Sequence, residues 1–315
     1  MELTWLIPIV DSWTASVAQG RPPHALMLTG SRGTGKRCAA AWLARRRLGM
    51  PAAALPEYPL SVPEHADLRW LTPPDDKHTI GIDQIRELVG ELSLTSYEGG
   101  GKVAVIEPAD AMTNNAANSL LKTLEEPPGD TLLILVVDRT GRLPATISSR
   151  CQRLSVRLPA EEEGLAWLQQ LQPGTSWARV LRDAGGAPLA AIGGLERLDQ
   201  TDVMAGEFRA VAEGRAAPLA VAAKWARLEP DFVLGWLGRQ VQICIAGTAR
   251  SGNAGTVAVI GDSVLERIDR RNLFCYLDII NRVRGQPAGS FNVQLTLECL
   301  LIDWSEHLAS IVGTE

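Results

Sequence analysis

Residues 24–36 read HALMLTGSRGTGK, and this stretch decides the fold class. Its first half, residues 24–29, is short and almost wholly apolar, which predicts a buried strand. Its second half, Gly30 to Lys36, fits the pattern G-x-x-x-x-G-K, which forms a phosphate-binding loop when it lies between a strand and a helix. The Ala- and Arg-rich stretch from Gly35 to Leu48 is expected to supply that helix. A strand, a glycine-rich turn and a helix in this order predict an α/β domain.

The rest of the first half keeps alternating between helix and strand signals. Helices are predicted over residues 82–92 and 115–124, and short apolar strands over residues 103–106 and 132–137. Fully apolar strands are typical of parallel sheets that helices cover on both faces. We therefore predict a doubly wound α/β domain. Residues 50–74, which are rich in Pro and Ala, are predicted to be irregular.

Beyond about residue 158 the strand signals cease, and the chain is predicted to be helical. Residues 160–171 and 177–183 are two expected helices, and Gly185-Gly186-Ala187-Pro188 breaks the pattern before another short one. After about residue 201 apolar residues recur at helical spacing, and one such stripe comprises Leu297, Leu300, Leu301, Trp304 and Leu308. These stripes indicate the core of a helical bundle, with the alternative that part of a stripe contacts other subunits.

The bulk properties of the chain bound its function. It has 315 residues, so two or three domains are expected, and its apolar content of 46% favours folded domains. With 31 Lys and Arg against 36 Asp and Glu, the formal net charge is −5, which excludes a global basic field for holding DNA. The 5 cysteines are widely spaced and odd in number, which favours free thiols in a reducing cytoplasm. The sequence has no signal-peptide pattern and no apolar run of membrane-spanning length, so a cytoplasmic protein without membrane contact is expected.

The candidate phosphate-binding residues are Gly30, Gly33, Gly35 and Lys36. The glycines let backbone N–H groups turn towards a phosphate, and Lys36 is expected at the β- and γ-phosphates. The next residue of an active loop is Ser or Thr, whose hydroxyl binds Mg²⁺, but here it is Arg37. A guanidinium has no acceptor for the metal and repels it. Two interpretations stay open: a site that binds ATP or ADP weakly, or a loop that only joins strand to helix.

Two further motifs follow the loop. Residues 120–128 read LLKTLEEPP, and Ser148-Ser149-Arg150-Cys151 comes after the next predicted strand. A phosphate loop followed by these two motifs resembles the clamp-loader branch of the AAA+ ATPases. The resemblance covers nearly the whole chain and is most specific over residues 114–128. Within that branch it points to the delta-prime family of bacterial DNA polymerase III clamp-loader subunits.

The resemblance implies that this chain lacks the residues that hydrolyse ATP. An ATPase of that branch carries Asp-Glu after the strand that ends here at Ile106, where the Asp holds the Mg²⁺ shell and the Glu activates water. This chain has Glu107-Pro108 instead, and a proline offers no acid–base chemistry. By the same comparison, the lid arginine that senses nucleotide falls near Leu189, and leucine cannot make that contact. Together with Arg37, these departures predict a subunit without ATP hydrolysis of its own.

Arg150 has a different implied role. In the clamp-loader relatives the arginine of Ser-Arg-Cys projects into the ATP site of the adjacent subunit. A planar, permanently charged guanidinium suits the charge spread over the γ-phosphoryl oxygens, and such arginine fingers contribute about 10³–10⁵ in rate. The alternative is a surface arginine in a salt bridge. Three other arginines lie close enough in sequence to be mistaken for the finger, namely Arg139, Arg142 and Arg153.

The resemblance also implies three domains and a set of partners. The domains are an AAA+ module over residues 1–158, a small helical lid over residues 159–201, and a helical collar over residues 202–315 that assembles a hetero-pentamer. The implied partners are the delta and gamma/tau subunits and, through them, the sliding clamp and primed DNA. Relatives carry a four-cysteine zinc module after the first helix. Residues 49–80 contain no cysteine, so no zinc is expected.

Other functions fit these residues less well. An active ATPase of the gamma/tau type would use Lys36 and Glu107, and Arg37, Pro108 and Leu189 argue against it. A DNA-binding protein that acts alone is disfavoured by the acidic net charge and by the lack of a basic run. A metabolic P-loop kinase would need a substrate site, for which the helical second half offers no motif.

Overall fold

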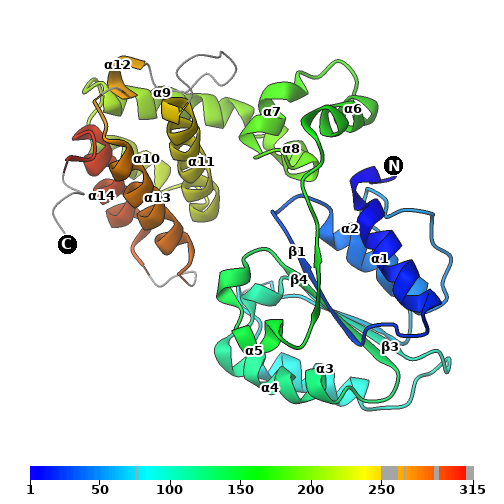
Figure 1. The fold of residues 1–315 in the computed structure, drawn as a ribbon. Helices are drawn as coiled ribbons and strands as arrows, with labels where there is room; N and C mark the ends of the chain where they lie inside the picture. The colour runs from blue at the N-terminus through cyan, green and yellow to red at the C-terminus, as the bar shows by residue number, and fades with distance from the viewer. Residues whose placement is uncertain (76, 250–261, 266, 287–290, 310–315) are drawn as a thin grey trace. The chain divides into compact units, whose positions relative to one another are not determined.

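The computed structural model describes residues 1–75, 77–249, 262–265, 267–286 and 291–309 (Figure 1). The chain divides into two compact units, residues 1–193 and residues 194–315. In the described residues the first unit is an α/β domain with a helical extension, and the second is helical. The division into three domains with breaks after residues 158 and 201 stays a prediction.

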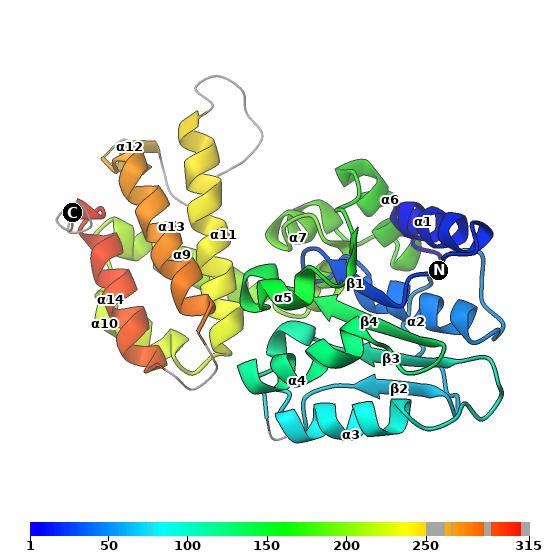
Figure 2. The same ribbon diagram turned by 60° about the horizontal axis from the view of Figure 1, so that its bottom comes forward.

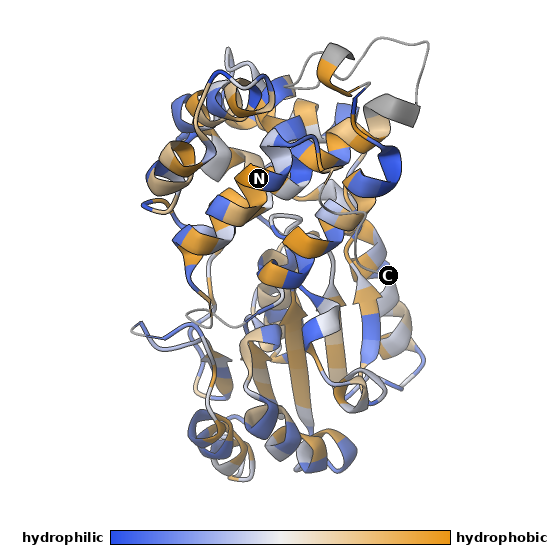
Figure 3. Cartoon of the chain, turned by 90° about the vertical axis from the view of Figure 1, so that its left-hand side faces the viewer, coloured by the Kyte–Doolittle hydropathy of each residue, from blue (hydrophilic) through white to orange (hydrophobic). Residues whose placement is uncertain are grey.

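The centre of the first unit is a parallel sheet of five strands in the order β2-β3-β4-β1-β5. The strands are β1 (Ala25–Thr29), β2 (Leu68–Leu71), β3 (Lys102–Ile106), β4 (Thr131–Val137) and β5 (Gln152–Ser155). Every residue of β1, β3 and β4 is buried, which explains why these three strands appear in the sequence as apolar runs (Figure 3). Because all the strands are parallel, their carboxyl ends meet at one edge of the sheet, where the phosphate loop begins.

Helices cover both faces of this sheet (Figures 1 and 2). On one face lie α1 (Ile7–Ala18) and α2 (Lys36–Arg47); on the other lie α3 (Ile82–Leu92), α4 (Asn114–Glu125) and the short α5 (Ala145–Ser148). The described residues of this unit also include three short 3₁₀ helices, namely η1 (Thr4–Leu6), η2 (Ala109–Ala111) and η3 (Thr140–Arg142). The predicted doubly wound α/β arrangement of this unit is confirmed.

Three helices follow β5, namely α6 (Glu161–Leu171), α7 (Trp177–Asp183) and α8 (Pro188–Leu195). Trp167 of α6 fixes this extension to the start of the chain. Its indole N–H donates to the Glu2 carbonyl at 3.0 Å, and its ring stands edge-on to Trp5 and Tyr58 at centroid distances of 5.5 and 5.7 Å. The N-terminal residues and α6 therefore pack together beside the phosphate loop.

The second unit is built from α9 (Leu198–Ala212), α10 (Pro218–Trp225), α11 (Pro230–Ala249), α12 (Asp262–Leu265), α13 (Arg270–Arg284) and α14 (Val293–Ser305). Its core is a cluster of large aromatic side chains. Phe208 stacks on Trp304 with ring centroids 4.4 Å apart, and both are fully buried. The buried Tyr276 hydroxyl donates to the Leu300 carbonyl at 2.7 Å, so that its one polar atom is satisfied. The apolar stripes of the sequence thus form this unit's core.

Among the elements that the sequence did not predict are α1, α5 and the two edge strands. Residues 68–71 were expected to be irregular, and this is wrong, because they form β2. An edge strand has a single neighbour and needs only part of its surface buried. In β2 only Leu68 is buried, and in β5 only Leu154. Neither strand therefore produces the apolar run by which the central strands were recognised.

Candidate functional site: the phosphate loop and Arg150

The phosphate loop joins β1 to α2, as the motif requires. At two of its glycines neighbouring atoms leave no room for a side chain. Gly30 has φ 146°, and a Cβ there would lie 2.3 Å from the Val156 carbonyl oxygen. Gly33 has φ 81°, and a Cβ there would lie 2.4 Å from the Ala190 nitrogen in α8. Gly35 caps α2 in the left-handed conformation with φ 96°. The glycines therefore serve the packing of the loop against the rest of the first unit.

Lys36 is turned back into its own loop. Its ammonium group donates to the carbonyls of Gly30 and Ser31 at 2.8 and 2.7 Å, and it forms an ion pair with Asp138 Oδ1 at 2.7 Å. An ammonium has three donors, so these contacts use its whole capacity. The Lys36 side chain is only 3% exposed. In this arrangement the lysine has no donor left for a phosphate.

Asp138 is the residue at this site that the sequence analysis missed. It directly follows β4, so the carboxyl end of that strand places it beside Lys36. Its backbone N–H donates to Asp110 Oδ1 at 2.9 Å. Burial raises the pKa of the Asp110 carboxyl, although the hydrogen bond from the Asp138 N–H opposes this shift. The sequence could have indicated Asp138 only by its position. It is the first polar residue after a central parallel strand, and ligands bind at the carboxyl ends of such strands.

Glu107 is engaged with Arg37 and Trp70. One of its carboxylate oxygens forms an ion pair with Arg37 Nε, and the other accepts the Trp70 indole N–H at 2.8 Å. Glu107 is only 8% exposed, so its charge is compensated inside the protein. The positive charge that faces Glu107 is the guanidinium of Arg37, the residue that stands where an active loop has Ser or Thr. In this arrangement both carboxylate oxygens of Glu107 are bound by side chains of the same chain.

The loop is also covered by two neighbouring segments. The Leu189 backbone N–H at the start of α8 donates to the Gly33 carbonyl at 3.0 Å. On the other side the Trp5 indole N–H donates to the Thr34 carbonyl at 2.8 Å, and both residues are buried. Leu189, which the resemblance put at the nucleotide-sensing position, thus contacts the loop through its backbone.

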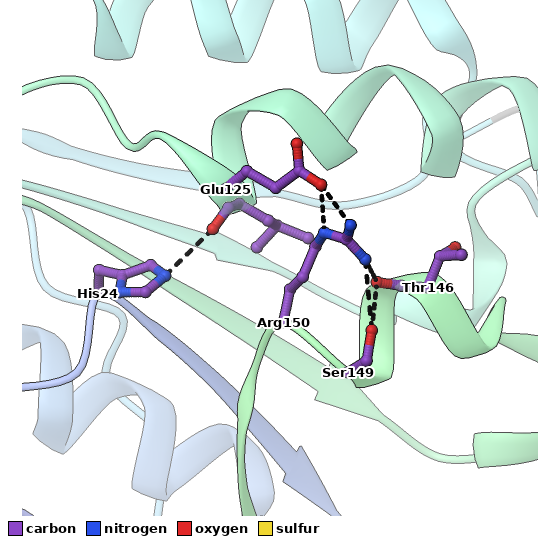
Figure 4. A network of polar contacts seen from close by, with 6 residues as sticks. His24, Glu125, Thr146, Ser149 and Arg150 are labelled. Atoms are coloured by element: carbon purple, nitrogen blue, oxygen red, sulfur yellow. Dashed lines mark hydrogen bonds and ion pairs between the residues drawn. The ribbon is translucent and has the colours of Figure 1, made fainter.

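Arg150 follows α5 after one intervening residue, Ser149, and its guanidinium is bound by groups of the same chain (Figure 4). Its Nε donates to Glu125 Oε1 at 2.7 Å, and its Nη2 forms an ion pair with the same oxygen. Its Nη1 donates to the Thr146 carbonyl at 3.0 Å and to the Ser149 hydroxyl at 3.3 Å. The Arg150 side chain is nevertheless 34% exposed. The guanidinium is therefore held in place by hydrogen bonds and is still accessible to solvent.

Arg150 and the phosphate loop do not share a site. Gln152 of β5 pairs with Leu26 of β1. Arg150 therefore lies beside the amino-terminal ends of the strands, near His24. The loop leaves the carboxyl end of β1, a strand of 5 residues that rises about 3.3 Å per residue. The two positions are thus separated by about 16 Å along the strand direction. Of the candidate residues, the structure brings together Gly30, Gly33, Gly35 and Lys36, but not Arg150.

Other site types find little support in the described residues. In the part of the chain that the structure describes, no group of three or more His, Cys, Asp or Glu residues is placed to hold a metal ion. The absence of zinc stays a prediction. No helix within the described ranges is both long and apolar enough to cross a membrane.

Comparison with known proteins gives consistent matches. A family model described as DNA polymerase III, delta subunit, matches residues 7–160. The DNA polymerase III subunit delta' of Pseudomonas aeruginosa is 30% identical over 320 residues, which cover 93% of this chain and 95% of the relative. The subunit delta' of Escherichia coli is 32% identical over 197 residues, which cover 60% of this chain and 59% of the relative.

A solved structure also resembles the whole chain. It is a DNA polymerase III gamma subunit-related protein from Thermotoga maritima, with a TM-score of 0.52 and 19% sequence identity. The match covers 98% of this chain and 99% of that one. At this level of identity the similarity establishes the fold.

Proposed function

This chain belongs to the family of DNA polymerase III delta' subunits, and from that membership we propose that it is a non-hydrolysing subunit of a clamp-loader complex. One observation carries the proposal: the two cations at the start of α2 are each paired with a carboxylate of the same chain. Lys36 is paired with Asp138, and Arg37 is paired with Glu107. Once Lys36 and Arg37 are paired in this way, their electrostatic attraction for the phosphates of ATP is reduced.

The second part of the proposal concerns Arg150, which we assign as an arginine finger acting on the ATP of a neighbouring gamma/tau subunit. Its guanidinium is partly exposed beside the amino-terminal ends of the strands, far from the chain's own phosphate loop. A role in phosphate chemistry therefore requires a nucleotide held by another chain. Fingers of this kind stabilise the charge that develops on the transferred phosphoryl group and contribute about 10³–10⁵ in rate.

The partners in this proposal are the delta subunit and the gamma/tau ATPases, with the sliding clamp and primed DNA as the objects of the complex. Residues 202–315, which contain the helical core of the second unit, are proposed as the collar that assembles the pentamer, and residues 159–201 as the lid. The chain's own loop then acts as a packing element, with at most weak ATP or ADP binding.

The alternative is an active ATPase of the gamma/tau type. It would need Lys36 and Glu107 to be available to nucleotide and metal, whereas both are engaged. Tight binding of Mg·ATP by the isolated chain would favour this alternative over the proposal.

The proposal is tested in a clamp-loader complex rebuilt with this chain. ATP hydrolysis stimulated by clamp and primed DNA is measured for the wild type, Arg150→Ala and Arg153→Ala, after each is shown to assemble. Arg153 is a matched control because it is exposed on the edge strand β5, three residues from Arg150. We expect turnover to fall about 10³-fold at the adjacent site with Arg150→Ala. Equal turnover of Arg150→Ala and wild type would rule out the finger.

A further inference from the structure

The carboxylate of Glu125 occupies the place at Arg150 that a phosphate oxygen would take. Two of the three guanidinium nitrogens, Nε and Nη2, face Glu125 Oε1, and the third is bound by Thr146 and Ser149 (Figure 4). A guanidinium recognises carboxylate and phosphate with the same fork of N–H donors. A phosphoryl group that approaches Arg150 therefore competes directly with Glu125.

Glu125 is held in this position by the backbone that carries it. It is the last residue of α4, which begins at the cap Thr113 and is anchored by buried Leu124. The His24 ring donates to the Leu124 carbonyl at 3.1 Å, which ties the end of α4 to the residue before β1 (Figure 4). The position of the Glu125 carboxylate beside Arg150 is thus fixed by α4 and by the hydrogen bond from His24, the residue before β1.

The neighbouring Glu126 provides the contrast. It carries the same charge one residue further on, is exposed, and makes none of the contacts with Arg150. A general effect of negative charge in this region would come equally from both glutamates. An effect that depends on the contact with Arg150 would come from Glu125 alone.

We propose that Glu125 is a positioning residue that holds Arg150 in a resting ion pair, which is exchanged for the terminal phosphoryl group of a nucleotide on the adjacent subunit. This inference rests on the proposed role of Arg150 as a finger. Glu125 keeps the guanidinium ordered at the surface before the neighbour's nucleotide arrives. It also takes the guanidinium back when the phosphoryl charge leaves. The exchange involves no covalent step and no proton transfer.

The ion pair is half-exposed, with side-chain exposures of 34% for Arg150 and 50% for Glu125. Exposed pairs of this kind are weak, so a phosphoryl group with a larger charge can displace the carboxylate. Removing the charge of Glu125 should therefore strengthen ATP binding at the adjacent site by about two- to fivefold. The contribution of Arg150 to the chemical step should remain.

The test uses the rebuilt clamp-loader complex with ATP, clamp and primed DNA, and fits KM and kcat separately for four variants. These are Glu125→Gln, Glu126→Gln, Arg150→Ala and the double variant Glu125→Gln/Arg150→Ala, each checked for assembly. We expect Glu125→Gln to lower KM by about two- to fivefold, and Glu126→Gln to leave it unchanged. In the Arg150→Ala background we expect Glu125→Gln to have no further effect, because Glu125 acts only through Arg150.

Each contrary outcome has a distinct meaning. An unchanged or raised KM in Glu125→Gln, with Arg150→Ala still defective, overturns the exchange and leaves the finger intact. A KM shift that persists in the double variant also overturns it, since Glu125 then acts independently of Arg150. Normal turnover of Arg150→Ala overturns the proposed function itself, and the exchange with it.

Discussion

Lys36 and Arg150 lie at opposite ends of the strands of one parallel sheet, and each is paired with a carboxylate at the same end. Lys36 follows the carboxyl end of β1 and is bound by Asp138. Arg150 precedes the amino end of β5 and is bound by Glu125. The two cations therefore cannot act on one phosphate within one chain. This separation is the physical basis for assigning a packing role to the loop and an intermolecular role to Arg150.

The first prediction concerns nucleotide binding at the chain's own loop. In Asp138→Asn the carboxylate that pairs with Lys36 is replaced by a neutral amide. Lys36 then becomes available to a phosphate, and a negative charge that repels phosphate is lost. We expect the affinity of the isolated chain for ADP to rise about tenfold, equivalent to about 1.4 kcal/mol. Isothermal titration calorimetry measures this change directly.

The matched control for that experiment is Asp130→Asn. Asp130 also pairs with a cation, Arg47, but it precedes β4 and so lies at the amino edge of the sheet. Its replacement should leave ADP affinity at the wild-type value. Identical ADP affinities for all three proteins would mean that Asp138 does not control the loop.

The second prediction concerns the packing of the loop against α8. Gly33→Ala forces a methyl group to within 2.4 Å of the Ala190 backbone and also strains a positive φ of 81°. We expect the free energy of unfolding of the first unit to fall by about 2–4 kcal/mol, from overpacking and strain together. Gly20→Ala isolates the strain, because Gly20 has φ 66° and open space around it. It should lose only about 1 kcal/mol. Denaturant unfolding compares the two, and equal losses would refute the close contact.

The third prediction concerns pH and Asp67, a carboxylate that organises the loop before β3. Burial opposes its charge, but the N–H groups of Tyr97 and Glu98 and the Ser96 hydroxyl donate to it and hold its pKa below its usual value. A lowered pKa stabilises the fold above the unfolded-state pKa of about 3.9. That stability is lost as the pH falls through the folded-state pKa.

The measurement for Asp67 is the Tm of wild type and Asp67→Asn between pH 3 and 7. At pH 7 the variant should be less stable by about 1–3 kcal/mol, because a charged hydrogen-bond acceptor is lost. The difference should shrink as the pH falls below the unfolded-state pKa of about 3.9, because the unfolded chain then binds a proton more readily than the folded carboxylate does. Asp11→Asn, a change at an exposed position of α1, should show no such trend. A stability difference that does not depend on pH would contradict the assigned cause.

The fourth prediction concerns the reactivity of the cysteines. Burial raises the pKa of Cys38 to about 11, and the pKa of Cys151 and Cys244 to about 12. The remaining two, Cys275 and Cys299, are exposed. Because the thiolate is the reactive form, iodoacetamide at pH 8 should label the two exposed residues first. Peptide mass spectrometry of the isolated, folded chain gives the order, and early labelling of Cys38 would contradict its burial.

The central elements of the first unit were predictable because their buried positions are apolar residues that recur in runs or at helical spacing. The apolar runs at residues 103–106 and 132–137 are confirmed as β3 and β4, and the amphipathic stripe at residues 82–92 as α3. The edge strands β2 and β5 escaped prediction, since each buries only one side chain and carries no run of apolar residues. Their existence depends on the neighbouring strand that each one pairs with.

For the candidate site, the sequence by itself determined the glycine-rich loop, the departures at Arg37 and Pro108, and the presence of Arg150 in its motif. These are local features, because each depends on residue type and spacing. Only the tertiary structure decided that Asp138 neutralises Lys36 and that Glu125 holds Arg150. Both are contacts between residues far apart in sequence. Their partners are selected by the order of strands in the sheet, which no local pattern encodes.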